Sequence, residues 1–194
     1  KGLAGGAAAG GLASILLGSK SGKKLAKTAL KVGGTAALAG LAYKAYQTWQ
    51  QNQSATAAPT STDPQGTVFL PTAAAARDDL SLVLLRAMIS AAKADGHIDA
   101  AEQQKIFTRL DTADLDTEAK AFVIDEMRKP LNIDAVVADA TSPERAVEIY
   151  AASVLAIEAD DPSEQAYLAM LAARLKLDPG LKATVEQETT KALA

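Results

Sequence analysis

Apolar residues recur at spacings of three and four from Arg77 to the end of the chain, the pattern of amphipathic helices. Leu80, Leu84, Met88 and Ala91 share one face of a first helix. Strands would show alternation with a period of two, which this region lacks. We therefore expect an all-α bundle of about seven helices. The further helices are predicted at 100–110, 117–129, 133–138, 143–159, 162–175 and 179–193.

Several predicted helices begin at recognisable capping residues. Asp99 precedes Glu102 by three positions, the spacing of a capping box. Asp161, Pro162 and Glu164 repeat this arrangement, with proline at the first helical position. Two more starts are predicted at Ser142-Pro143 and Asp178-Pro179.

The chain opens with an uncharged segment, residues 2–18, made almost wholly of Gly, Ala, Leu and Ile. Gly2, Gly6 and Gly10 would share one helix face, where small residues let a second helix approach closely in lipid. In water each glycine costs a helix about 1 kcal/mol relative to alanine. The composition therefore favours a membrane or a self-associating oligomer.

A lysine-rich stretch, residues 20–31, separates this segment from a second apolar stretch at 32–43. Tyr43, Tyr46 and Trp49 close the second stretch, with Lys44 among them, and this mixture is typical of a membrane interface. We expect residues 1–49 to be a membrane-associated segment. A hairpin of two short helices, a single tilted span and a surface-lying amphipathic segment all fit. The alternative is a disordered leader.

Residues 50–76 have the composition of a flexible linker, rich in Gln, Ser, Thr, Ala and Pro. One apolar patch, Val68-Phe69-Leu70, interrupts it. This patch either docks onto the helical domain or is an exposed apolar patch in a flexible chain. The expected division is thus a membrane segment at 1–49, a linker at 50–76 and an acidic helical domain at 77–194.

Charge and composition narrow the classes of function that the chain can have. Residues 1–50 hold seven lysines and no acid, whereas residues 51–194 hold the other 13 basic residues and all 23 acids, a net charge of −10. This split suggests that the N-terminal part meets an anionic surface, and it counts against nucleic-acid binding by the domain. The chain has no cysteine and one histidine, His97, and no catalytic motif, so we expect a protein that is not an enzyme.

Three runs of residues carry a family resemblance. Residues 84–99 (LLRAMISAAKADGHID) and 167–179 (YLAMLAARLKLDP) resemble a TerB-like domain, related to tellurite-resistance proteins. Residues 42–49 (AYKAYQTW) and the glycine-rich leader resemble the YebE type of bacterial inner-membrane protein. The resemblance covers nearly the whole chain and implies a TerB-like helical domain attached to the bacterial inner membrane. It also implies metal binding through acidic turns.

Two acidic turns, each following a long apolar helix, form the candidate metal site. Hard divalent cations such as calcium or magnesium require several oxygen ligands. The alternative is that these acids cap helices, where the helix dipole favours negative charge. His97 lies in the first turn, as an exposed turn residue or as a further ligand. The candidate ligands are Asp95, Asp99, Glu102, Glu158, Asp160, Asp161 and Glu164.

Together these features predict a membrane-tethered interaction module of the bacterial inner membrane. The expected partners are the lipid membrane, further copies of the chain and a protein of unknown identity. One alternative is an envelope stress protein that binds or senses a divalent metal. Another is a structural protein that self-assembles through its Gly-x-x-x-Gly faces. The side of the membrane on which the helical domain lies stays open.

Overall fold

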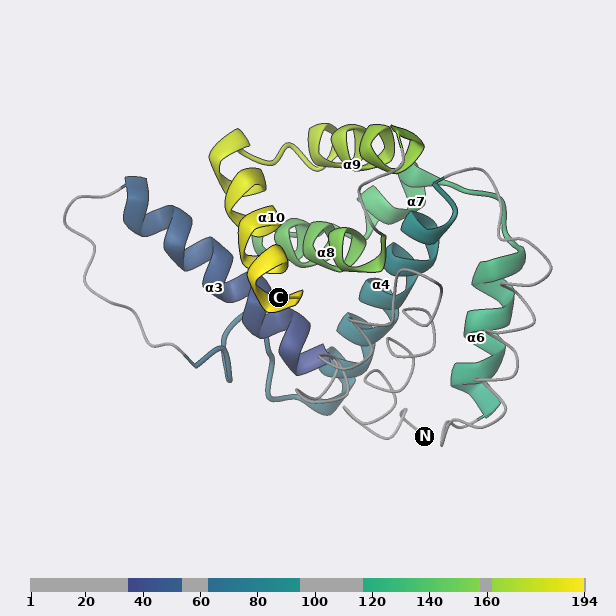
Figure 1. Cartoon of the computed structure of the whole chain (residues 1–194). Helices are drawn as coiled ribbons and strands as arrows, with labels where there is room; N and C mark the ends of the chain where they lie inside the picture. The colour runs from purple at the N-terminus through teal and green to yellow at the C-terminus, as the bar shows by residue number, and fades with distance from the viewer. Residues whose placement is uncertain (1–34, 54–62, 95–116, 158–161, 194) are drawn as a thin grey trace.

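The computed structural model describes residues 35–53, 63–94, 117–157 and 162–193, and these residues form an all-α bundle (Figure 1). The main-chain pairing between Gln65 and Leu70 is an isolated bridge. Seven helices make up the described part of the chain: α3 (Thr35–Gln53), α4 (Ala74–Ala92), α6 (Thr117–Arg128), α7 (Ile133–Ala138), α8 (Pro143–Ala156), α9 (Pro162–Arg174) and α10 (Pro179–Leu193).

Helix α8 lies at the centre and packs against α3, α4, α9 and α10 (Figure 1). Its middle is buried on all sides, and alanines such as Ala151 and Ala152 let neighbouring helices come close. The helix begins as predicted: Ser142 Oγ accepts a hydrogen bond from Arg145 N at 3.2 Å, and Pro143 occupies the first turn. Helix α8 is therefore the core of the bundle, with α6 packed on α4 and α7 packed on α4 and α9.

Most of the helices predicted from periodicity are confirmed. The bounds of α7 and α10 agree with the prediction, and those of α6, α8 and α9 differ only at the C-terminal end. Helix α4 begins three residues before Arg77. The helix predicted at 100–110 lies outside the described residues.

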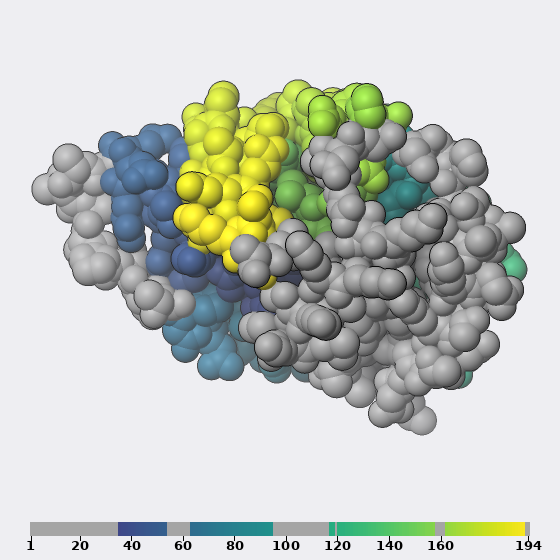
Figure 2. Space-filling view, viewed as in Figure 1, coloured from purple at the N-terminus to yellow at the C-terminus, as the bar shows by residue number. Residues whose placement is uncertain are grey.

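The largest departure from expectation is α3, a 19-residue helix that belongs to the bundle. It packs against α10, α8 and α4, and Figure 2 shows α3 and α10 side by side on one face. Leu38 and Tyr43 are buried beside three fully buried alanines, Ala39, Ala42 and Ala45. Small residues at these positions allow α3 to approach its neighbours closely.

Polar contacts hold α3 along its length. At its first residue, Thr35 and Ser81 of α4 share a hydrogen bond of 2.9 Å between their hydroxyls. Farther along, Lys44 Nζ lies 2.7 Å from Glu188 of α10, a carboxylate that is only 5% exposed. Lys191 and Lys44 together lower the pKa of Glu188, so this carboxylate stays ionised.

The aromatic residues expected at a membrane interface instead contact the domain. The rings of Tyr43 and Phe69 lie 5.4 Å apart, and those of Tyr46 and Phe69 lie 5.6 Å apart. Helix α3 also runs across the boundary expected between residues 49 and 50. The structure therefore gives no support for a membrane role of residues 35–49. Residues 1–34 lie outside the described part of the chain. Among the described helices, none is long and apolar enough to cross a membrane.

Part of the segment expected as a linker is docked on the bundle. Gly66 adopts a φ of +79°, which glycine tolerates, and its N–H donates to the carbonyl of Leu70 at 2.9 Å. This turn places Phe69, 3% exposed, against α3, whereas Val68 stays exposed. The docking alternative for this patch is confirmed through Phe69.

Because α3 is part of the core, a charge on its buried face should destabilise the domain. We expect Ala42→Asp to destabilise the fold by about 3 kcal/mol or more, because an unpaired carboxylate would be buried. Ala36→Asp, on the exposed face of the same helix, is the matched control and should be nearly neutral. Thermal unfolding followed by circular dichroism measures both, and equal stability of the two variants would contradict the packing of α3.

Candidate functional site

A groove of about 560 Å³ lies where the C-terminal half of α3 meets two connections, α7–α8 and α9–α10. Aromatic and aliphatic side chains line most of it, with a few polar groups, as in many ligand sites. Its lining residues are Tyr46, Trp49, Val137, Ala140, Thr141, Ser142, Pro143, Ala146, Arg174, Leu175, Lys176, Leu177, Asp178 and Leu181.

Trp49 is fixed in this groove by a hydrogen bond. Its Nε1 donates to Asp178 Oδ1 at 3.0 Å. The same oxygen caps α10, because it accepts the N–H groups of Gly180 at 2.8 Å and Leu181 at 3.2 Å. The hydrogen bond from Trp49 and these backbone hydrogen bonds lower the pKa of Asp178. The Asp178 carboxylate thus holds the Trp49 side chain at the start of α10.

Gly180 lets the indole ring lie against the start of α10. A Cβ at this position would be 3.1 Å from Asp178 Oδ1 and 3.6 Å from the Cδ1 and Nε1 atoms of Trp49. A larger residue would thus press on the capping carboxylate and touch the indole ring. Glycine at this position therefore leaves the capping carboxylate of Asp178 undisturbed.

Lys176 has an unusual backbone conformation, with a φ of +56°. It lies at the end of α9 in a Schellman turn: Lys176 N donates to Ala173 O and Leu177 N donates to Ala172 O, both at 3.1 Å. Glycine is the usual residue at this position, because a side chain there costs about 1 kcal/mol or more. We therefore expect the lysine to cost the fold stability relative to glycine.

Charges around the groove are unevenly compensated. Arg174 forms an exposed ion pair with Asp134 of α7, and Asp178 is held by Trp49 and the N-terminus of α10. Within the described residues the exposed ammonium of Lys176 has no such partner. The N-terminus of α8 also borders the groove and contributes a positive dipole end, whereas that of α10 is already occupied by the Asp178 carboxylate. The groove thus favours an acidic ligand.

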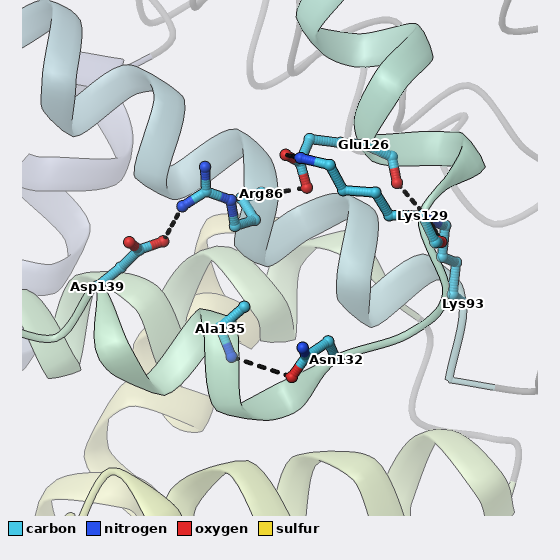
Figure 3. Close-up of polar contacts among 7 residues, drawn as sticks. All are labelled: Arg86, Lys93, Glu126, Lys129, Asn132, Ala135 and Asp139. Carbon is cyan, nitrogen blue, oxygen red and sulfur yellow. Dashed lines mark hydrogen bonds and ion pairs between the residues drawn. The ribbon is translucent and has the colours of Figure 1, made fainter.

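A second polar cluster joins α4 to α6 (Figure 3). Arg86 of α4 reaches Asp139 at 2.5 Å and Glu126 of α6 at 3.6 Å, and Lys129 also pairs with Glu126. Lys93, which is buried, donates to the carbonyls of Glu126 at 2.5 Å and Lys129 at 2.8 Å, where α6 ends. Every charged group of the cluster has a partner, so its evident role is to hold α6 on α4.

Glu148 of α8 is a buried carboxylate, 1% exposed, and neither of its oxygens has a hydrogen-bond donor among the described residues. The nearest cation is Arg145, whose Nη1 lies 3.6 Å away, too far for a hydrogen bond. Burial therefore outweighs the attraction of Arg145 and raises the pKa of Glu148 to about 8. Glu148 is protonated at neutral pH.

Only a small part of the two acidic turns lies within the described residues. Glu164 is half-buried in the first turn of α9, the position at which helix capping places an acid. In the described ranges no three His, Asp or Glu residues gather into a metal site. The metal site and the role of His97 stay predictions, since these candidate ligands lie outside the described residues: Asp95, Asp99, Glu102, Glu158, Asp160 and Asp161.

The groove residues were not identified as a site from the sequence. Asp178 was predicted as a helix start, and this is confirmed, but its bond to Trp49 joins positions 129 apart in the chain. A helix that packs on one side only could have been predicted for α3 from the polar residues between its apolar positions. These polar residues are Lys44, Gln47 and Gln50.

The cost of the lysine in the Schellman turn is measurable. We expect Lys176→Gly to stabilise the domain by about 1 kcal/mol, because glycine adopts a positive φ without strain. The same change at Lys182, inside α10, should instead destabilise by about 1 kcal/mol. Urea unfolding of both variants tests this, and destabilisation by Lys176→Gly would show that the turn is not strained.

The buried acid makes stability depend on pH. The folded state keeps Glu148 protonated up to about pH 8, whereas the unfolded chain ionises near 4.5, so stability falls as the pH rises between these values. Between pH 4.5 and 7 the free energy of unfolding of the parent chain should fall by roughly 3 kcal/mol because of Glu148. Glu148→Gln should abolish this fall. Urea unfolding at both pH values measures it, and parallel pH profiles for the variant and the parent chain would refute the assignment.

Comparison with known proteins identifies the family to which the chain belongs. An uncharacterised protein encoded in the ampR 5′ region of Yersinia enterocolitica is 30% identical over 105 residues, which cover 54% of this chain and 76% of that protein. No solved structure matches the chain. A family model described as "Protein of unknown function (DUF533)" matches residues 2–189, nearly the full length. The chain belongs to this family, which is TerB-like.

Proposed function

We propose that this protein is a membrane-attached interaction module of the bacterial inner membrane, of the YebE type. Residues 1–34 attach it to the membrane, and the helical domain binds a protein partner through the groove at Trp49. The observation that supports this most is the position of α3, which follows the basic leader directly and ends at the groove.

Helix α3 would couple membrane attachment to the orientation of the domain. Its first residue, Thr35, is buried and bonded to Ser81 of α4. A membrane segment that ends at residue 34 would therefore meet a packed helix, without a flexible linker between them. The domain would lie close to the membrane in a restricted orientation, unlike a domain on a long tether.

The groove lies at the opposite end of α3 from the leader. Trp49 is 14 residues beyond Thr35, which corresponds to about 21 Å along a helix. The leader carries Lys20, Lys23, Lys24 and Lys27, each worth about 1 kcal/mol beside anionic lipid. With the leader on the membrane, the groove would be held away from the point of attachment, where a protein partner has access.

Membrane fractionation tests this proposal. The full chain should sediment with membranes, whereas a chain that lacks residues 1–30 but keeps all of α3 should stay folded and soluble. Release by high salt alone would identify the lysines as a peripheral contact, and resistance to alkaline carbonate would identify an integral segment.

Circular dichroism of the shortened chain is the control for folding. A full chain that never sediments with membranes, or a folded shortened chain that sediments equally well, would contradict attachment through the leader.

A further inference from the structure

We propose that the groove at Trp49 recognises a short peptide segment of a partner protein in which an acidic side chain lies beside an aromatic or aliphatic one. This inference rests on the proposed interaction function and names the chemistry of its partner. Lys176 receives the acidic group, and Tyr46 and Trp49 with the neighbouring leucines receive the apolar side chain.

The charges at the groove favour an acidic ligand. Other charges at the groove already have partners, since Arg174 pairs with Asp134, and Asp178 accepts from Trp49 and from α10. Lys176 is exposed and, within the described ranges, engages no acid. A carboxylate at this position would gain a charge-assisted hydrogen bond to Lys176 and the dipole of the α8 N-terminus.

The backbone of Lys176 supports a role beyond folding. At a φ of +56° glycine would be favoured, so a lysine here opposes the stability of the turn. Residues held in sparsely populated backbone regions are frequent at binding sites, where the side chain contributes to binding. In this turn the strained residue is also the groove's uncompensated cation.

Shape and position favour a peptide over a lipid. The groove, of about 560 Å³, has the size of a site for a few side chains. Its aromatic wall has defined contacts: the Tyr46 and Trp49 rings lie 5.6 Å apart, and Trp49 donates a hydrogen bond to Asp178. The groove also lies at the end of α3 distant from the leader, as described above.

Trp49 is the single tryptophan of the chain, so its fluorescence reports on the groove directly. The probe is a phage-displayed library of short random peptides, selected on the purified full chain. Enriched peptides should combine an acidic residue with a nearby aromatic or aliphatic residue. When synthesised and titrated, they should change the Trp49 emission in a saturable manner.

Charge reversal then tests Lys176. Lys176→Glu should weaken binding of the selected peptides by about tenfold or more. Lys120→Glu makes the same change of charge on α6, on the far side of the bundle from α3 (Figure 1), and should leave binding unaltered. Lys176→Gly, expected to fold more stably, should also bind weakly, which separates loss of binding from loss of folding.

The inference is overturned if no peptide is enriched, if the enriched peptides lack an acidic residue, or if Lys176→Glu and Lys120→Glu bind alike. It is also overturned if Lys176→Glu reduces sedimentation with vesicles containing phosphatidylglycerol while peptide binding is unchanged, because Lys176 would then contact lipid. Membrane attachment of the parent chain is scored separately by fractionation, so either proposal can fail without the other.

Discussion

The pairing of α3 with α10 is the contact on which the architecture of this domain depends. Buried alanines on α3 allow close packing, and polar contacts fix the register: Lys44 pairs with Glu188, and Trp49 bonds to Asp178. These two contacts, together with the bond between Thr35 and Ser81, hold both ends of α3. Without α3, one side of α8 and α10 would lose its apolar cover.

The groove is a consequence of this pairing. The carboxylate of Asp178 performs two tasks, since it caps α10 and orients the indole of Trp49, and Gly180 leaves room for that carboxylate. The Schellman turn that ends α9 then places Lys176 at the same groove. A helix start, a helix end and an aromatic side chain from a distant segment thus converge through local backbone chemistry and one long-range hydrogen bond.

Periodicity and capping residues were sufficient to predict the C-terminal helices, because Ser142-Pro143 and Asp178-Pro179 mark helix starts locally. They were not sufficient to place α3. A helix with alanines, leucines, aromatic residues and one lysine fits a membrane interface as well as a helix-packing surface, and only tertiary contacts distinguish the two. The conformation of Lys176 could not be predicted either, since the sequence offers no glycine at the end of α9.

Helix α3 belongs to the folded domain, and the aromatic residues near its end line a groove of the protein. Quenching of Trp49 fluorescence by nitroxide-labelled lipids, in vesicles that carry the full chain, tests this most directly. We expect quenchers at every depth of the bilayer to leave the Trp49 emission unchanged. Strong quenching from within the bilayer would place α3 in the membrane and not in the folded domain.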